Sequence, residues 1–184
     1  MSERLIERAR HGDPDAFVAL IEERQAAMSR VATAILGSGA DAADAIQDAL
    51  VAAWRGLPRL RDDGAFDPWL ERILVNSCRL AIRRRNHRRV REMSLPPVSG
   101  DDGTDLPHPR AGDDLEGIAE REAFDRAFDG LAIDDRAIVV LHHLEGRSLA
   151  DVGRVLGIPV GTAKSRLFHA RRRLDLALRA ESDG

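Results

Sequence analysis

The sequence of 184 residues contains little cysteine and few aromatic residues. Its single cysteine, Cys78, excludes an intramolecular disulfide and a metal site made of several cysteines. Tyrosine is absent and aromatic residues make up only 4% of the chain, which favours helices over strands. No apolar run approaches the roughly 18 residues of a membrane span. Because the charged N-terminus also lacks the apolar segment of a signal peptide, we expect a cytoplasmic protein with no membrane insertion.

The charge of the chain is unevenly distributed. A net charge of −3 by itself argues against a nucleic-acid partner. However, residues 79–91 contain seven arginines, residues 152–173 contain six basic residues, and neither segment contains an acidic residue. Lys164 is the only lysine among the 28 basic residues; this bias suits recognition of phosphates and bases, but GC-rich coding explains it equally well. The two basic segments are therefore candidates for nucleic-acid contact.

The composition changes sharply once, in residues 94–114. This stretch holds four of the eight prolines together with glycine, serine, threonine and aspartate, and it has no helical periodicity. We therefore predict an all-α protein of two small helical domains, residues 1–91 and 115–184, joined by a flexible acidic linker over residues 92–114.

Helix starts are expected where a short polar side chain can accept hydrogen bonds from exposed backbone N–H groups. The predicted caps are Asp13, Asp41, Asp67, Asp134 and Ser148. Asp13 and Asp67 are each followed by proline, which suits the first helical position because its missing N–H is no loss there. The segment 58–65 is predicted to be a polar loop.

Residues 148–173 have the layout of a helix-turn-helix. The first helix is expected to end at Gly157, because a tight turn between helices requires a residue that tolerates positive φ. The second helix, from about Val160, begins with small polar residues and continues with cations. This order suits a helix whose N-terminus enters the major groove of DNA while its later residues contact phosphates. A solvated basic helix face is the alternative interpretation.

The other basic run, residues 79–91, is open to two interpretations. Cations are favoured near a helix C-terminus, so a solvated helix end would explain the arginines. The absence of interleaved aromatic residues argues against base stacking along a single strand and favours phosphate contact.

An acidic face is predicted on the helix that contains Asp44, Gln47 and Asp48. These residues lie at i, i+3 and i+4 and therefore share one side of the helix, opposite its apolar side. They form either a docking face for a partner protein or ordinary surface polarity.

Three segments, in this order, resemble the extracytoplasmic-function (ECF) class of bacterial sigma factors. Residues 41–54 are similar to the family's core-binding helix, and residues 66–85 to its minus-ten helix. Residues 144–174 are similar to its minus-35 helix-turn-helix and carry the pattern G-x-P-x-G-T-x-K-S-R. The resemblance implies a region 2-like helical bundle followed by a region 4-like helix-turn-helix domain. It also implies a sigma factor that binds core RNA polymerase and directs promoter-specific initiation. A helix-turn-helix regulator without polymerase docking is the alternative.

The resemblance assigns roles to individual residues. It places Asp44, Gln47 and Asp48 against the polymerase clamp helices. It assigns the minus-ten element to Asn76, Arg79, Arg83 and Arg84, near the loop 58–65. It assigns the minus-35 element to Thr162, Lys164, Ser165, Arg166, His169 and Arg172. The sequence departs from the pattern at Leu80, where members often have aspartate, at Ala163, where many have valine, and at Ala132, where proline is frequent.

The implied partners are core RNA polymerase, promoter DNA and an anti-sigma factor, with no cofactor, no metal and no catalysis by this chain. The competing possibility is an enzyme with Cys78 as nucleophile. No His–Asp spacing supports it, and the adjacent His142 and His143 point to different faces, which makes a poor metal pair. We expect Cys78 to be buried or unreactive.

Overall fold

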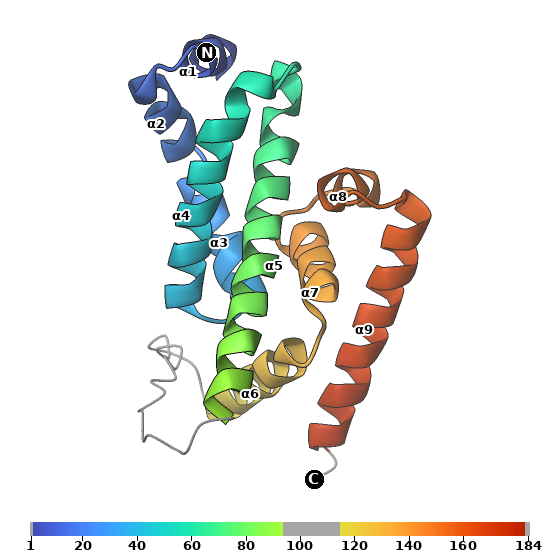
Figure 1. Cartoon of the computed structure of the whole chain (residues 1–184). Helices are drawn as coiled ribbons and strands as arrows, with labels where there is room; N and C mark the ends of the chain where they lie inside the picture. The colour runs from blue at the N-terminus through green and yellow to red at the C-terminus, as the bar shows by residue number, and fades with distance from the viewer. Residues whose placement is uncertain (1, 94–114, 183–184) are drawn as a thin grey trace.

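The computed structural model describes residues 2–93 and 115–182, and within these ranges it contains helices and no strands (Figure 1). The N-terminal module (residues 2–93) consists of α1 (Ser2–Arg10), α2 (Pro14–Glu22), α3 (Gln25–Leu36), α4 (Gly39–Gly56), the 3-10 turns η1 (Leu57–Arg59) and η2 (Asp63–Ala65), and α5 (Phe66–Met93). The C-terminal module (residues 115–182) consists of α6 (Leu115–Asp129), α7 (Ile133–Val139), the π-helical turn η3 (Val140–Leu144), α8 (Leu149–Leu156) and α9 (Val160–Ser182).

The predicted all-α fold class is confirmed for the described residues. The predicted linker lies outside them, apart from its first two residues, which belong to α5. The predicted polar loop 58–65 contains parts of both 3-10 turns. No helix in the described ranges is long and apolar enough to cross a membrane.

Two of the predicted helix caps are confirmed. The side chain of Asp13 accepts hydrogen bonds from the backbone N–H groups of Asp15 and Ala16, at 3.1 Å each. The side chain of Ser148 accepts one from the backbone N–H of Asp151, also at 3.1 Å. These contacts satisfy N–H groups that have no partner within the helix.

The other three predicted caps are wrong. Ser38 caps α4 in place of Asp41, α5 already begins at Phe66, and Ala132 precedes α7 without a side-chain cap. The physical reason is that Asp41, Asp67 and Asp134 lie within the first helical turn, where each carboxylate pairs with a distant arginine. Their negative charges still suit the positive N-terminal end of each helix.

The core of the N-terminal module lies between α3, α4 and α5, which run side by side in Figure 1. The α4 side of this core consists of small residues at helical spacing: Ala42, Ala45, Ala49 and Ala53. Such small side chains let α5 pack close to α4. The opposite side of α4 is exposed and carries polar residues such as Asp44 and Gln47.

The two modules pack against each other. Helix α5 contacts both α7 and α8, and one cluster of buried side chains includes Ile35 and Leu74 of the first module with Ile138 and Val152 of the second. Arg136, whose side chain is almost fully buried, donates a hydrogen bond to the backbone carbonyl of Ile35 at 3.2 Å. The described chain therefore has a continuous apolar core across the module boundary.

Candidate nucleic-acid interface

Helices α8 and α9 form the helix-turn-helix that the sequence predicts. Gly157 ends α8 with φ of 70°, which confirms the expected left-handed turn. A side chain on Gly153 would place its Cβ 2.8 Å from the backbone oxygen of Ile158, so the turn also requires glycine there. Apolar residues of both helices, including Val152 and Leu167, are buried and hold the pair together.

Helix α9 presents a polar face to solvent along most of its length. The buried side consists of Ala163, Leu167, Ala170 and Leu174. Of the predicted minus-35 residues, Lys164, Ser165, His169 and Arg172 are exposed, whereas Thr162 and Arg166 are partly buried. Phe168 lies between them and is 63% exposed, an unusual position for so large an apolar side chain. The face therefore offers cations, small polar groups and one apolar ring.

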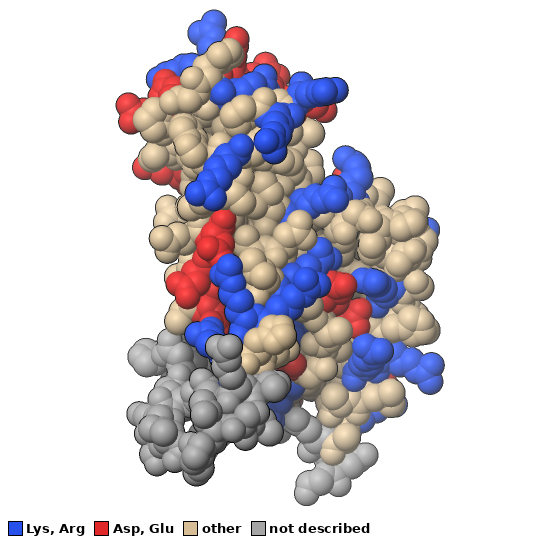
Figure 2. Space-filling model, in the orientation of Figure 1, with Lys and Arg blue, Asp and Glu red and all other residues tan. Residues whose placement is uncertain are grey.

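Arg166 is directed away from the centre of this face. Its Nη1 lies 3.1 Å from Oδ2 of Asp134, and Asp134 Oδ1 accepts a hydrogen bond of 2.7 Å from Nε of Arg79. Partial burial acts to raise the pKa of Asp134, but Arg79 and Arg166 together outweigh burial and hold that pKa below its usual value. Figure 2 shows the corresponding pattern, with acidic side chains over α7 between basic ones over α5 and α9.

The predicted minus-ten residues lie together on α5. Asn76 is exposed and accepts a hydrogen bond of 2.8 Å from Arg79. Arg83 and Arg84 are exposed, and Arg84 also pairs with Asp48 of α4 at 2.7 Å. Leu80 is 43% exposed among them, so the sequence's departure from the family pattern lies on the surface and not in the core.

The acidic face predicted on α4 lies opposite its buried alanines. Asp44 and Gln47 are exposed, and Asp48 is partly exposed beside Arg84. The same side of the helix continues with Val51 and Trp54, which are 44% and 37% exposed. The apolar pair was not predicted as part of this face, although positions 44, 47, 51 and 54 repeat at the helical period and could have indicated it.

Both modules match known protein families. The Sigma-70 region 2 family matches residues 20–88, and the Sigma-70 region 4 family matches residues 121–174. The chain is 30% identical over 181 residues to the ECF RNA polymerase sigma-E factor of Escherichia coli K12, covering 93% of this chain and 91% of that protein.

The chain belongs to the ECF sigma factor family. It is also 35% identical over 164 residues to the sigma factor SigM of Mycobacterium tuberculosis (strain Erdman), covering 89% of this chain and 77% of that protein. Among solved structures it resembles CnrH in complex with the cytosolic domain of CnrY, with a TM-score of 0.68 and 25% identity over 98% of this chain and 99% of that one. It also resembles RpoE of Bartonella quintana in complex with the anti-sigma factor NepR, with a TM-score of 0.66 and 25% identity over 88% of this chain and 97% of that one.

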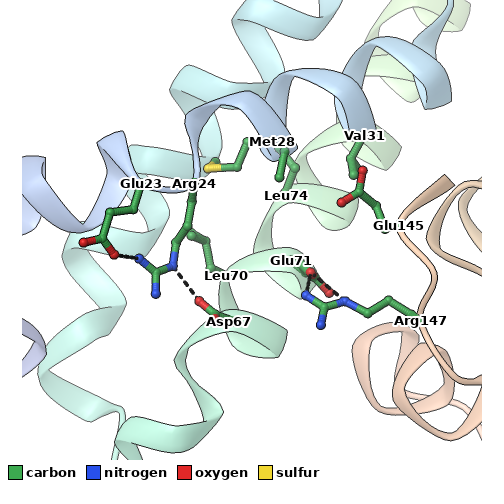
Figure 3. Close-up of a pocket in the computed structure, with 11 residues that line it drawn as sticks. Glu23, Arg24, Met28, Val31, Asp67, Leu70, Glu71, Leu74, Glu145 and Arg147 are labelled. Atoms are coloured by element: carbon green, nitrogen blue, oxygen red, sulfur yellow. Dashed lines mark hydrogen bonds and ion pairs between the residues drawn. The ribbon is translucent and has the colours of Figure 1, made fainter. Parts of the chain in front are cut away.

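The sigma factor also has a cavity between its two modules, of about 280 Å³ (Figure 3). Its floor is apolar, with Met28 and Leu74, and its rim carries charged groups from both modules. Arg147, from the connection before α8, pairs with Glu71 of α5. Burial raises the pKa of Glu71 despite this arginine, and its Oε2 finds no hydrogen-bond partner in the described part of the chain. The cavity thus lies where charged groups of the two modules meet.

Nothing in the described residues forms a metal site of three or more histidine, cysteine or acidic side chains. Cys78 is fully buried in α5, as expected, and burial raises its pKa to about 12. Because the thiolate is the reactive form, this thiol is a poor nucleophile. The expectation that His142 and His143 point to different faces is wrong, because their rings pack edge to face with centroids 4.8 Å apart. His142 Nδ1 is engaged with the backbone oxygen of Arg147.

Proposed function

We propose that this sigma factor directs core RNA polymerase to promoters by using α9 at the minus-35 element and α5 at the minus-ten element. The observation that carries the proposal is the exposed face of α9, which lies in helix-turn-helix geometry with Lys164, Ser165, His169 and Arg172 toward solvent. The assigned domains are residues 1–91, for polymerase binding and minus-ten recognition, and residues 115–184, for minus-35 recognition, with residues 92–114 as the linker.

The two modules each contribute part of the DNA-binding affinity. Some cations of each DNA-contacting helix are paired with carboxylates, as Arg79, Arg84 and Arg166 are, so we expect each module to neutralise few phosphates and to bind weakly alone. Joining two weak sites raises their combined affinity through effective concentration, provided both can reach their elements at once. Polymerase binding would supply that geometry.

The polymerase-binding surface in this proposal is the side of α4 that carries Asp44, Gln47 and Asp48. Exposed apolar Val51 and Trp54 extend it, and Trp54 is held by Phe17 at 5.1 Å between ring centroids. Aromatic residues are enriched at protein interfaces, because they bury a large area at low entropic cost. The surface therefore combines an acidic strip with an apolar anchor.

Further roles follow from family membership. Sigma factors are regulatory proteins, and we propose that this chain has no catalytic activity of its own and leaves the chemistry to the polymerase. It would act in the cytoplasm, where polymerase and chromosome meet. The solved structure of RpoE with an anti-sigma factor supports a similar inhibitory partner for this chain. A regulator that acts without polymerase is disfavoured by membership of the ECF sigma factor family.

The test measures binding of the full chain to purified core RNA polymerase by fluorescence anisotropy. Asp44→Arg reverses a charge that makes no ion pair among the described residues, so it is cleaner than a change at Asp48, which would also release Arg84. We expect at least a tenfold weaker complex. Glu22→Arg, an equal charge change on an exposed residue of α2, is the matched control and should bind like wild type. Equal affinity for wild type and Asp44→Arg would contradict the proposed surface.

A further inference from the structure

One carboxylate joins arginines from both proposed DNA-contacting helices. Asp134, in the first turn of α7, accepts from Arg79 of α5 at 2.7 Å and from Arg166 of α9 at 3.1 Å, one arginine on each oxygen. The three side chains are partly buried, with exposed fractions of 22% for Arg79, 37% for Asp134 and 38% for Arg166. The pairs therefore form at the edge of the module boundary, where solvent and ligands have access.

The position of this carboxylate distinguishes it from the other contacts between modules. Arg30 pairs with Glu145 at 3.3 Å, and Arg147 pairs with Glu71 on the cavity side of the boundary (Figure 3). None of these four residues is assigned to DNA. Among the described acidic residues that pair across the module boundary, Asp134 alone binds two arginines that the proposed function assigns to DNA.

The two arginines cannot serve both promoter elements in this arrangement. Both guanidinium groups touch the same carboxylate, whereas the minus-ten and minus-35 elements lie about 25 base pairs apart, roughly 85 Å at ~3.4 Å per base pair. Recognition of both elements therefore requires the modules to separate, and separation breaks at least one of the two pairs. Guanidinium binds carboxylate and phosphate oxygens in the same way, so a DNA phosphate is a direct replacement for Asp134.

We propose that Asp134 is an autoinhibitory latch, which adds to the apolar contacts that hold the two modules together and withholds Arg79 and Arg166 from DNA until phosphates replace the carboxylate. This inference rests on the proposed DNA contacts of α5 and α9. The latch reduces binding of the free chain to random DNA, because opening costs the Asp134 pairs. Any partner that holds the modules apart removes that cost and makes both arginines available together.

The test compares Asp134→Asn with wild type in the full chain. Asparagine keeps the shape of the side chain but removes the charge that attracts both arginines. Asp175→Asn is the matched control, since among the described residues Asp175 pairs only with Arg179 of the same helix, and its replacement changes the net charge equally. The first measurement is the distance between spin labels on cysteines introduced at Ala52 of α4 and Ala180 of α9, two exposed positions. The buried Cys78 should remain unlabelled.

The second measurement is binding of the free proteins to a mixed-sequence 20-base-pair DNA duplex at low salt. We expect Asp134→Asn to lengthen or broaden the label distance and to bind the duplex about three- to tenfold more tightly, the scale expected for loss of partly exposed ion pairs. Asp175→Asn should match wild type in distance and gain less than about twofold in affinity.

The outcomes separate the latch from the proposed function. An unchanged label distance in Asp134→Asn overturns the latch, whatever the DNA binding. A longer distance with no gain in DNA affinity beyond that of the Asp175→Asn control also overturns the latch, because the released arginines would then not contact DNA. Failure of wild type to bind core polymerase overturns the proposed function through a measurement in which Asp134 takes no part.

Discussion

Lys164 occupies the exposed N-terminal part of α9, where a recognition helix contacts bases and nearby phosphates. No carboxylate pairs with it among the described residues, in contrast to Arg166, which Asp134 holds at 3.1 Å. Lys164 can therefore contact DNA without any change in the packing of the modules. It is the residue whose substitution tests the minus-35 assignment with least disturbance of the fold.

We predict that Lys164→Gln weakens binding to the minus-35 element. If the lysine contacts a base, the loss is about 1–3 kcal/mol and preference at that base pair is relaxed. If it contacts a phosphate, affinity falls uniformly for all sequences and the dependence on salt becomes shallower by about one unit of slope. The measurement is a set of single-base-pair variants of a promoter duplex, titrated at several salt concentrations in the presence of core polymerase.

Arg8→Gln is the control for that measurement, since Arg8 is an exposed cation of α1, outside both basic segments, and pairs with Asp13. It should leave both affinity and base preference unchanged. Unaltered DNA binding by Lys164→Gln would remove Lys164 from the interface.

The sequence could not show which arginines of residues 79–91 are free. Arg79, Arg84 and Arg85 pair with acidic residues that lie 55, 36 and 44 positions away in the chain. Helical periodicity relates residues within a few turns and contains no information about such partners. The arginine run therefore predicted a basic surface, but it could not predict that acidic residues from other helices neutralise part of that surface.

At the scale of elements, the helix-turn-helix was predictable because local chemistry determines it. Ser148 caps α8, Gly157 supplies the positive φ, and Ile158 to Pro159 leads directly into α9. The remaining helix starts were less predictable. Asp41 and Asp67 have the residue type of a cap, but each lies inside its helix and pairs with a distant arginine, Arg85 of α5 and Arg24 of the turn before α3. An aspartate at the cap position and an aspartate within the first helical turn look alike in the sequence, and only tertiary contacts distinguish them.

The close approach of α8 to its turn gives a prediction for Gly153. In Gly153→Ala the new Cβ would lie 2.8 Å from the backbone oxygen of Ile158, which cannot move without shifting the turn. We expect a loss of stability of about 1–3 kcal/mol, as for overpacked core sites. Urea denaturation monitored by circular dichroism measures it.

Gly161→Ala is the matched control on the next helix, because nothing lies within 4 Å of a Cβ built there. Alanine is also the better helix former, so this variant should be at least as stable as wild type. Equal stability of the Gly153 and Gly161 variants would show that the turn is looser than the structure has it.

At the scale of the whole molecule, the sequence predicted two modules but not their contact. Ile138 and Val152 of the second module are buried in one cluster with residues of the first. Each lies on an apolar stripe that could equally have been covered within its own module. The choice of covering surface depends on shape and on ion pairs such as Arg30–Glu145, which join residues 115 positions apart.

The closed arrangement should depend on pH through Asp134. Its pKa is lower in the folded chain than in the unfolded one, so the stabilisation from its pairs is present above the ordinary aspartate value of about 4. That stabilisation is lost as the pH falls through the lowered folded pKa. We expect wild type to exceed Asp134→Asn in urea midpoint at pH 5–7, with the difference shrinking below about pH 4. A difference that grows toward acid pH would have the wrong sign for this carboxylate.

The central claim is that the chain binds core RNA polymerase and selects start sites with helices α5 and α9. Run-off transcription with purified core polymerase and a pool of genomic templates tests it most directly. We expect discrete transcripts that appear only when the full chain is added. These transcripts should be lost with Asp44→Arg and reduced with Lys164→Gln. Transcription that is no more specific with the chain than with core polymerase alone would contradict it.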